Sequence, residues 1–543
     1  MKQTNRTLLI LMLLFVALMS LPFLVPHTGF LALMGFVPLL MMEVVAESGK
    51  VKHFFWWYYA AFVLWNAVTT FWVCMATVGG GIFAVLANAL QMALIFSIYR
   101  GSRKFFGDVL AYVFLALMWI AWEKFYFSAQ ISWPWLTLGN AFASSTECIQ
   151  WYEYTGTLGG SLWVWLSNLW LFYVLMIFMS GYAASMKRSG LVTAVAVLLA
   201  VVAGPLVWSF SIGRHYEEKS TGTLDVVMVQ PNFDPYQKFQ HLSQAQQTKI
   251  FLDLAGKGLK DYNLSEDHPV LLTAPETFAN DVVLGAVEEG STWQAFNRFL
   301  SDKPGVNILF GASSYRFSEG DEAPSPVARH LLDGRWLQSY NSALMMDSTG
   351  RTEIYHKSKL VVGVELTPYP ALFTRIDDKL GGVMGRCEGQ EEVSLLNVAT
   401  YDSTGVSGTA SLGCAVCYES VYGDYCRGYV EKGAEAMTVI TNDAWWGNTP
   451  GYRQHLNYSC LRAIELRRDI ARCANTGITA IIDQRGRIVD RTDWWQPQIL
   501  KGKINLSDAQ TAFVRYGDIP GRICTFAFLL LLAFLLVKMI TRR

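Results

Sequence analysis

The chain has 543 residues, of which 52% are hydrophobic and only 16% are charged. This composition is too apolar for an ordinary soluble protein, so part of the chain is expected to lie in a membrane. Lysine plus arginine and aspartate plus glutamate number 44 each. No overall positive field is available to attract nucleic acid, and we predict no nucleic-acid partner.

Long apolar runs are confined to the two ends of the chain. A hydrocarbon core of about 30 Å needs about 20 helical residues, and eight runs approach this length: 7–25, 29–47, 54–77, 80–99, 108–126, 159–181, 190–211 and 522–540. The first run resembles a signal peptide in its flanking cations, but no small-residue cleavage site follows it. We predict a transmembrane domain over 1–212, a catalytic domain over 213–520 and a C-terminal transmembrane helix over 521–543.

The cations of the short loops all fall on one side of these spans. They are Lys2, Arg6, Lys50, Lys52, Arg100, Arg103, Lys104, Lys187, Arg188, Lys538, Arg542 and Arg543. The opposite loops include residues 127–158, which hold no lysine or arginine. The positive-inside rule therefore predicts that both termini are cytoplasmic and that residues 213–520 lie outside the cytoplasm.

Residues 127–158 are rich in tryptophan and tyrosine, which favour the interface between membrane and water. We expect this segment to lie flat on the outer leaflet. It would serve either as a plain interfacial anchor or as part of a lipid or peptide site.

The region 213–520 alternates between strand and helix patterns. Strands are predicted at 224–230, 269–276, 306–315 and 434–443, and helices near 241–262, 287–301, 421–433 and 453–469. Two hairpins are predicted to turn at 347–350 and at 485–486. This alternation predicts an α/β layered fold with a mixed sheet whose faces are covered by helices.

Three side chains able to perform chemistry follow predicted strands. Glu276 closes "VLLTAPE", Lys357 ends "TEIYHK" and Cys417 ends "SLGCAVC". A carboxylate, a cation and a thiol are the minimum set for covalent acyl transfer: a base, an oxyanion partner and a nucleophile. Because strand residues three apart point to opposite faces, Cys414 is expected to be core packing rather than a partner of Cys417.

Longer blocks around these residues resemble the nitrilase superfamily. They are "APETFAN", "YHKSKLV", "CYES" and "NDAWWG", within residues 223–503. The resemblance implies an αββα sandwich and a Glu-Lys-Cys triad. The eight spans and "SWPWLTLGNAF" are similar, more narrowly, to the apolipoprotein N-acyltransferase family of the bacterial inner membrane.

That narrower resemblance implies the reaction and its partners. An acyl chain would pass from a phospholipid, typically phosphatidylethanolamine, through a cysteine thioester to the N-terminal amine of a diacylglyceryl-apolipoprotein. Glu276 would be the general base, Lys357 the oxyanion-side cation and Cys417 the nucleophile.

The resemblance also assigns supporting residues. Glu365 would orient the site or hold a proton, and the Tyr418 amide would join an oxyanion hole. Glu419 matches a family carboxylate, the structural alternative being a buried acceptor for backbone or tyrosine donors. The family commonly reads L-V-P-F-G-E up to its second glutamate, whereas this chain reads "LVVGVE". The resemblance therefore does not determine the backbone geometry of this loop.

Two further segments are assigned to the acyl pocket or its entrance. Residues 366–400 are long for a connection and are expected to form a lid with Tyr369, Leu372 and Phe373, or else a plain surface loop. Trp445 and Trp446 would be core or wall residues, or would line the acyl pocket.

No cofactor or metal is predicted. The histidines, including His356 and His455, lack ligand spacing, and no phosphate-binding glycine motif opens a helix after a strand. Four further cysteines of this domain, Cys387, Cys426, Cys460 and Cys473, are expected either to pair or to remain buried thiols.

Three other functions stay open from the sequence. They are a membrane-bound nitrilase-like amidase that hydrolyses amides or esters, a non-catalytic scaffold, and an oxidoreductase that uses the C-x-x-C pair.

Overall fold

The computed structural model describes residues 2–235, 238, 242–265, 268–379, 384–402 and 405–541. The chain divides into two compact units. One unit comprises Met1–Tyr216 and Tyr516–Arg543, and the other comprises Glu217–Arg515.

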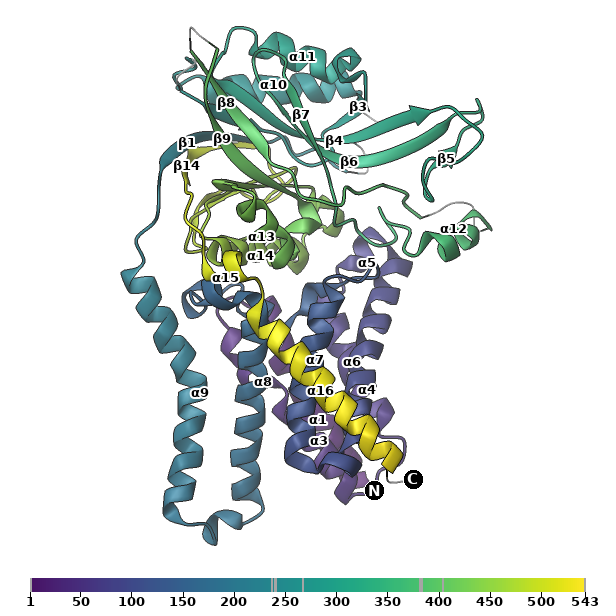
Figure 1. Ribbon diagram of the computed structural model, residues 1–543, viewed down its shortest axis with the longest axis vertical. Coiled ribbons are helices and arrows are strands. Elements are labelled where there is room, and N and C mark those ends of the chain that lie inside the picture. The colour runs from purple at the N-terminus through teal and green to yellow at the C-terminus, as the bar shows by residue number, and fades with distance from the viewer. Residues whose placement is uncertain are drawn as a thin grey trace. The chain divides into compact units, whose positions relative to one another are not determined.

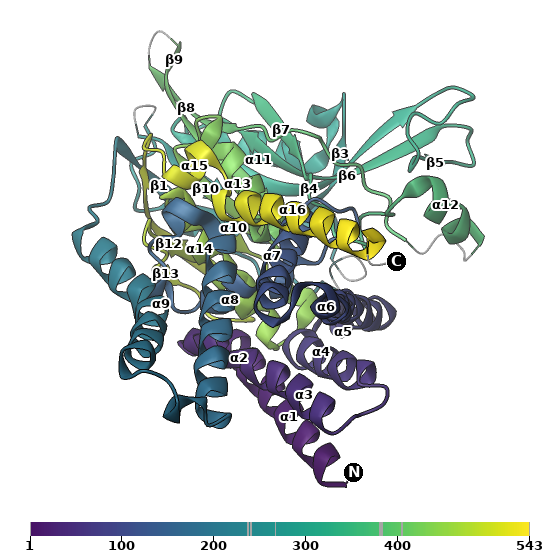
Figure 2. The same cartoon turned by 60° about the horizontal axis from the view of Figure 1, so that its bottom comes forward.

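The first unit is helical (Figures 1 and 2). Its long helices are α1 (Lys2–Leu24), α3 (Val37–Ser48), α4 (Phe55–Thr70), α6 (Val78–Phe106), α7 (Asp108–Tyr126), α8 (Tyr152–Met179), α9 (Arg188–His215) and α16 (Ile519–Thr541). Seven helical segments of the described residues are long and apolar enough to cross a membrane: Gln3–Leu24, Gly29–Ser48, Val78–Phe106, Asp108–Tyr126, Tyr152–Met179, Arg188–His215 and Ile519–Thr541. The expected multi-pass helical part is confirmed.

The span expected at 54–77 is instead divided. Helix α4 has 16 residues and ends at Thr70, and the short α5 (Val73–Ala76) follows. The Trp72 indole donates to the Thr69 carbonyl at 3.2 Å and so satisfies an acceptor at the end of α4. At about 1.5 Å per residue, α4 rises about 24 Å, which is less than a typical hydrocarbon core.

The aromatic segment is folded into this unit rather than laid on its surface. It forms the short helices η2 (Pro134–Leu136), η3 (Leu138–Phe142) and η4 (Thr146–Cys148), and Trp135 is fully buried. The Leu138 amide donates to Glu123 of α7 at 2.9 Å, and the Gly139 amide donates to Ser161 of α8 at 3.1 Å. Residues 134–142 are therefore buried within the helical unit, where side chains of α7 and α8 bind their backbone groups. The position of the segment at the outer leaflet stays a prediction.

The second unit contains two β-sheets. The eight-stranded sheet has the order β14 (Gln498–Leu506), β1 (Gly222–Gln230), β2 (Val270–Thr273), β4 (Val306–Ser318), β6 (Trp336–Met346) and β5 (Arg329–His330), with β3 (Ala279–Val283) on β4 and β7 (Thr352–His356) on β6. The six-stranded sheet has the order β13 (Ile488–Arg491), β12 (Ala480–Ile482), β11 (Ile470–Ala474), β10 (Ala436–Thr441), β9 (Gly405–Val416) and β8 (Leu396–Asp402).

Side-chain alternation along β1 shows how this unit is layered. Val226 and Met228 belong to the hydrophobic core shared with the six-stranded sheet. Val227 and Val229 belong to a second core, which includes residues of α10 (Gln244–Leu259) and α11 (Ser291–Leu300). Successive strand residues point to opposite faces, so each face of β1 is covered by a different layer.

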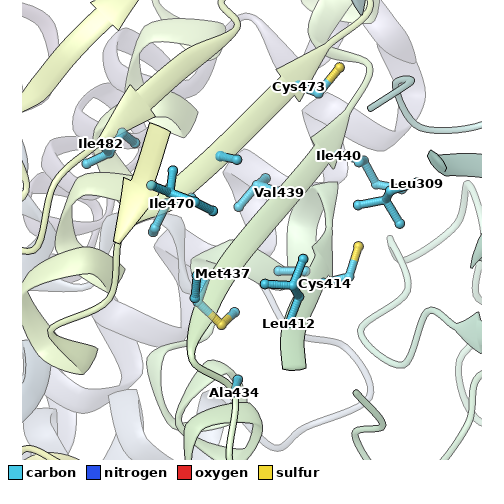
Figure 3. Close-up of a cluster of buried hydrophobic side chains, with 14 of the residues drawn as sticks. Leu309, Leu412, Cys414, Ala434, Met437, Val439, Ile440, Ile470, Cys473 and Ile482 are labelled. Carbon is cyan, nitrogen blue, oxygen red and sulfur yellow. The ribbon is translucent and has the colours of Figure 1, made fainter. Parts of the chain in front are cut away.

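The outer face of the six-stranded sheet is covered by α13 (Gly423–Glu431) and α14 (Pro450–Leu466), whose apolar residues belong to the same hydrophobic core cluster as Val226 and Met228. Cys414 lies in this core with Leu412, Met437 and Val439 (Figure 3). The αββα sandwich implied by the resemblance is confirmed. The single mixed sheet expected from alternation alone is wrong, because the strands divide between two sheets.

Candidate active site

Three strand ends carry the predicted triad. Glu276 lies three residues after β2, Lys357 directly follows β7, and Cys417 directly follows β9. The first two strands belong to the eight-stranded sheet and the third to the six-stranded sheet. The residues that would form the site are therefore contributed by both layers of the sandwich.

Lys357 is bound by two carboxylates. Its Nζ lies 3.1 Å from Glu276 Oε1 and 3.0 Å from Glu365 Oε1. The Lys357 side chain is 1% exposed and that of Glu276 is 8% exposed. A buried ammonium is tolerated here because opposite charges contact it directly.

The loop that departs from the family pattern still presents Glu365 to Lys357. The Glu365 amide donates to the Val361 carbonyl at 2.8 Å, and the Val361 amide donates to Glu365 Oε2 at 2.8 Å. Gly363 has φ of 81°, which a residue with a side chain rarely adopts. A tight turn therefore holds the Glu365 carboxylate, although residues 362 and 364 are valines.

Asn341 on β6 contacts both carboxylates and was missed by the sequence analysis. Its Nδ2 donates to Glu276 Oε1 at 2.8 Å and to Glu365 Oε1 at 2.6 Å. The Asn442 amide donates to the other Glu276 oxygen at 3.1 Å. These donors fix the orientation of Glu276, and no local motif marks them.

The pKa values of Lys357 and Cys417 depend on burial and on the same carboxylates. Burial alone would lower the pKa of Lys357, but Glu276 and Glu365 outweigh it and raise this pKa well above its usual value. Burial and the Glu276 charge raise the pKa of Cys417 well above that of an ordinary thiol, while Lys357 opposes this shift. The resting site therefore pairs an ammonium with a protonated thiol.

Cys417 leaves the sheet through an unusual backbone conformation. It begins the 3-10 turn η7 (Cys417–Val421) with φ of 53°. A non-glycine residue with positive φ is uncommon and is found mainly where the surroundings enforce it. Tyr418 follows it, and its buried ring packs edge-on against Tyr422.

Glu419 is a buried acceptor that ties the end of β9 to the loop after Lys357. It accepts from the Tyr355 hydroxyl at 2.6 Å, the Ser358 amide at 2.6 Å and the Val416 amide at 2.8 Å. Burial raises its pKa, although these donors oppose the shift. This geometry matches the structural alternative for Glu419.

Cys417, Asp443 and His455 are the residues whose geometry comes nearest to a metal site among those that the structure describes. Their ligand atoms lie within 4.8 Å of one another. Asp443 already contacts Arg472 at 2.5 Å and His455 at 2.9 Å. The trio is therefore a hydrogen-bonded network whose carboxylate is already neutralised.

The expected lid contains regular structure. Helix α12 (Pro370–Lys379) follows Tyr369, which is 48% exposed, and the Phe373 amide donates to the Tyr369 carbonyl. The side chain of Leu372 lies outside the described residues, as do Gly381 and Gly382, two adjacent glycines within the expected lid.

The two tryptophans after β10 differ in exposure. Trp445 is 38% exposed, whereas Trp446 is partly buried, packs against the hydrophobic cluster that includes residues of α14, and contacts His455 edge-on. All nine cysteines, including Cys387, Cys426, Cys460 and Cys473, are free thiols.

Comparisons with known proteins agree with both parts of the chain. The family model described as "Apolipoprotein N-acyltransferase N-terminal domain" matches residues 16–170, and the model described as "Carbon-nitrogen hydrolase" matches residues 274–512. A solved structure of Saccharomyces cerevisiae Nit3, a member of branch 10 of the nitrilase superfamily, is similar with a TM-score of 0.37 and 13% identity, over 56% of this chain and 97% of that chain.

Two curated relatives extend the match over most of the chain. The apolipoprotein N-acyltransferase of Chlorobaculum tepidum is 28% identical over 505 residues, which cover 92% of this chain and 90% of the relative. That of Geobacter metallireducens is 25% identical over 475 residues, covering 86% of this chain and 82% of the relative. The amidase alternative is not favoured. The chain is therefore similar to apolipoprotein N-acyltransferases over most of its length.

Proposed function

We propose that this chain moves an acyl chain from a phospholipid to the N-terminal amine of diacylglyceryl-cysteine in lipoproteins, the last step of their maturation. The observation that carries the proposal is the buried Lys357 ammonium, held by Glu276 and Glu365 beside the Cys417 thiol. The names of the curated relatives support the same reaction.

In the first half-reaction, Glu276 takes the proton of the Cys417 thiol as the sulfur attacks the ester carbonyl of the phospholipid. Lys357 and the Tyr418 amide stabilise the oxyanion of the tetrahedral intermediate. The ester C–O bond then breaks, and the leaving alkoxide takes the proton from Glu276. An acyl thioester on Cys417 and a lysophospholipid result. Phosphatidylethanolamine is the proposed donor.

In the second half-reaction, the lipoprotein amine attacks the thioester carbonyl. Glu276 accepts a proton from the attacking nitrogen, and the same donors stabilise the second oxyanion. The C–S bond breaks, the thiolate regains a proton, and an amide is formed. While Glu276 carries the proton, Glu365 still contacts the Lys357 ammonium and stabilises its charge.

The supporting residues act at a distance from the acyl carbon. Glu365 anchors Lys357, and Glu419 holds the strand end from which Cys417 emerges. Tyr369, Leu372 and Phe373 are proposed to guard acyl entry, with Trp445 and Trp446 on the wall of the acyl pocket.

The proposed orientation places both termini in the cytoplasm and residues 213–520 in the periplasm. Contacts within the helical unit support this assignment, because the cationic loops meet at one end of it. Arg103 at the end of α6 contacts Glu47 at the end of α3, and Lys538 of α16 donates to the Phe105 carbonyl at 3.1 Å. We accordingly assign 1–212 and 521–543 to the inner membrane of a bacterial cell.

The transfer is tested with protein purified in detergent, phosphatidylethanolamine and a synthetic diacylglyceryl-cysteine peptide. Mass spectrometry of the peptide should show one added acyl chain, and Cys417→Ser should abolish the product. Cys414→Ser is the matched control and should retain activity, since Cys414 lies in the core between the sheets. Release of free fatty acid without peptide acylation would contradict the proposal.

A further inference from the structure

The proposed mechanism leaves one buried group of charged residues unused. It consists of Asp443 in η8 (Asp443–Trp446), His455 in α14 and Arg472 in β11. Each of the three is 0% exposed. Buried charges of this kind persist when each one is paired, and their placement beside the nucleophile calls for a functional explanation.

His455 contacts the nucleophile through the backbone. Its Nε2 lies 3.0 Å from the Cys417 carbonyl oxygen and 2.9 Å from Ser420 Oγ. The Ser420 hydroxyl donates its own hydrogen to the Cys417 carbonyl at 2.8 Å. Since the hydrogen of Ser420 is used there, Ser420 Oγ acts as an acceptor toward the ring, and Nε2 carries a hydrogen.

The other ring nitrogen is held by Asp443. His455 Nδ1 lies 2.9 Å from Asp443 Oδ1, which also accepts from the Thr441 hydroxyl at 2.6 Å. Arg472 lies 2.5 Å from Asp443 Oδ2 and 3.2 Å from His455 Nδ1. Burial alone would raise the pKa of Asp443, but Arg472 and His455 lower it to about 2. The carboxylate therefore stays ionised and fixes the ring.

The carbonyl that His455 contacts belongs to the residue with the unusual backbone. Positive φ is sterically unfavourable at a non-glycine residue, and Cys417 has φ of 53°. A donor on this carbonyl stabilises the turn that directs the Cys417 side chain out of the sheet. A rigid Asp443–His455 pair supplies that donor from α14, independently of Glu276 and Lys357.

We propose that His455, oriented by Asp443, is a positioning residue that holds the Cys417 backbone so that the thiol meets the acyl carbonyl. The ring does not act as the thiol's base, because Nε2 is engaged by the Cys417 carbonyl and Ser420, and Nδ1 by Asp443. The inference rests on the proposed function, since acylation of Cys417 is the step that misplacement would slow.

The test compares His455→Leu, which removes the donor, with His455→Gln, whose amide can still donate toward the carbonyl. Ser459→Ala is the matched control, since this buried serine lies on the same helix and its hydroxyl has no hydrogen-bond partner among the described residues. Purified proteins are mixed with phosphatidylethanolamine, and the rate at which the Cys417 acyl adduct forms is followed by intact mass, alongside thermal unfolding.

His455→Leu should slow adduct formation about tenfold to a hundredfold, the range expected for misplacing a reacting group. KM for the phospholipid should change little, and His455→Gln should recover part of the rate. Alkylation of Cys417 by iodoacetamide should be nearly unchanged, because this small reagent can react without the precise alignment of thiol and carbonyl that acylation requires.

Three results would overturn the inference. They are adduct formation by His455→Leu at the wild-type rate, alkylation that falls as far as acylation, and a Gln variant as slow as the Leu variant. The second result would mean that His455 controls the reactivity of the Cys417 thiol rather than its position. If the wild-type protein forms no adduct, the result contradicts the proposed function. Failure of the proposed function is thus distinguished from failure of the role of His455. Should His455→Leu not fold, Ser420→Ala removes the other donor to the same carbonyl and should slow acylation without affecting alkylation.

Discussion

The Lys357 ammonium lies 3.1 Å from Glu276 Oε1, with both side chains buried. The Glu276 carboxylate, which would accept the thiol proton, is thus paired with the Lys357 ammonium, which would stabilise the oxyanion. The pair can exchange a proton with substrate groups while the site retains a positive charge near the acyl carbon.

Replacing Lys357 by methionine should reduce acyl transfer about a hundredfold to a thousandfold, the usual effect of removing an oxyanion partner. Arginine should not rescue it, because a planar guanidinium cannot occupy the position of the Nζ atom between Glu276 and Glu365. Single-turnover acylation of Cys417 measures the effect. The control is Lys359→Met, whose ammonium lies 5.4 Å from the centre of the Tyr422 ring. A Lys357→Met protein that acylates at the rate of this control would contradict the assigned role.

Asn341→Leu should impair both stability and transfer. The amide donates to two buried carboxylates, and hydrogen bonds to charged groups contribute about 1.5–3 kcal/mol each. A lower midpoint of thermal unfolding and a slower single-turnover rate are expected. The comparison is Asn397→Leu, since Asn397 on β8 bonds to Glu353 at 3.2 Å, a partly buried carboxylate outside the triad. Equal rates of acylation in the two variants would show that Asn341 does not orient Glu276.

Alkylation of Cys417 should become faster with pH throughout the neutral and mildly alkaline range. The thiolate is the reactive form, and burial with the Glu276 charge raises the pKa of this thiol well above its usual value. The thiolate fraction therefore grows about tenfold per pH unit below that pKa. Lys357→Met should slow alkylation further, since Lys357 lowers the same pKa. A rate that levels off near neutral pH would mean that the thiol is already ionised.

Fusions to the C-terminus report its side of the membrane. Green fluorescent protein placed after residue 543 should fluoresce, and alkaline phosphatase at the same position should be inactive, because the positive-inside rule retains this end in the cytoplasm. Phosphatase fused after residue 515, before α16, should be active. The reverse pattern would contradict the proposed orientation.

Local patterns in the sequence identified much of the second unit. Hairpin turns at 347–350 and 485–486 lie between β6 and β7 and between β12 and β13, as expected from their glycines. The strand β11 was missed because its five residues, "IARCA", follow α14 after only three residues and are all buried. A buried run of this length lacks the alternation that marks a strand.

The partners of the candidate site depend on contacts between distant residues. Asn341 is 65 residues from Glu276, and His455 is 38 residues from Cys417. A single sequence contains no local signal for such pairs. Likewise, the hydropathy of residues 54–77 favours one span, whereas α4 ends at Thr70 and the Trp72 indole donates to the Thr69 carbonyl. Aromatic content alone also could not show that Glu123 and Ser161 hold residues 138–139 inside the helical unit.

The most direct test of the central claim is the intact mass of the purified protein after incubation with phosphatidylethanolamine of one acyl composition, without a lipoprotein acceptor. We expect a mass increase of one acyl group minus one hydrogen, located by peptide mapping on Cys417 and reversed by neutral hydroxylamine. Adding a diacylglyceryl-cysteine peptide should remove the adduct and yield the N-acylated peptide. A protein that acylates the peptide while Cys417 never carries the acyl group, or that carries it on another residue, would contradict the account.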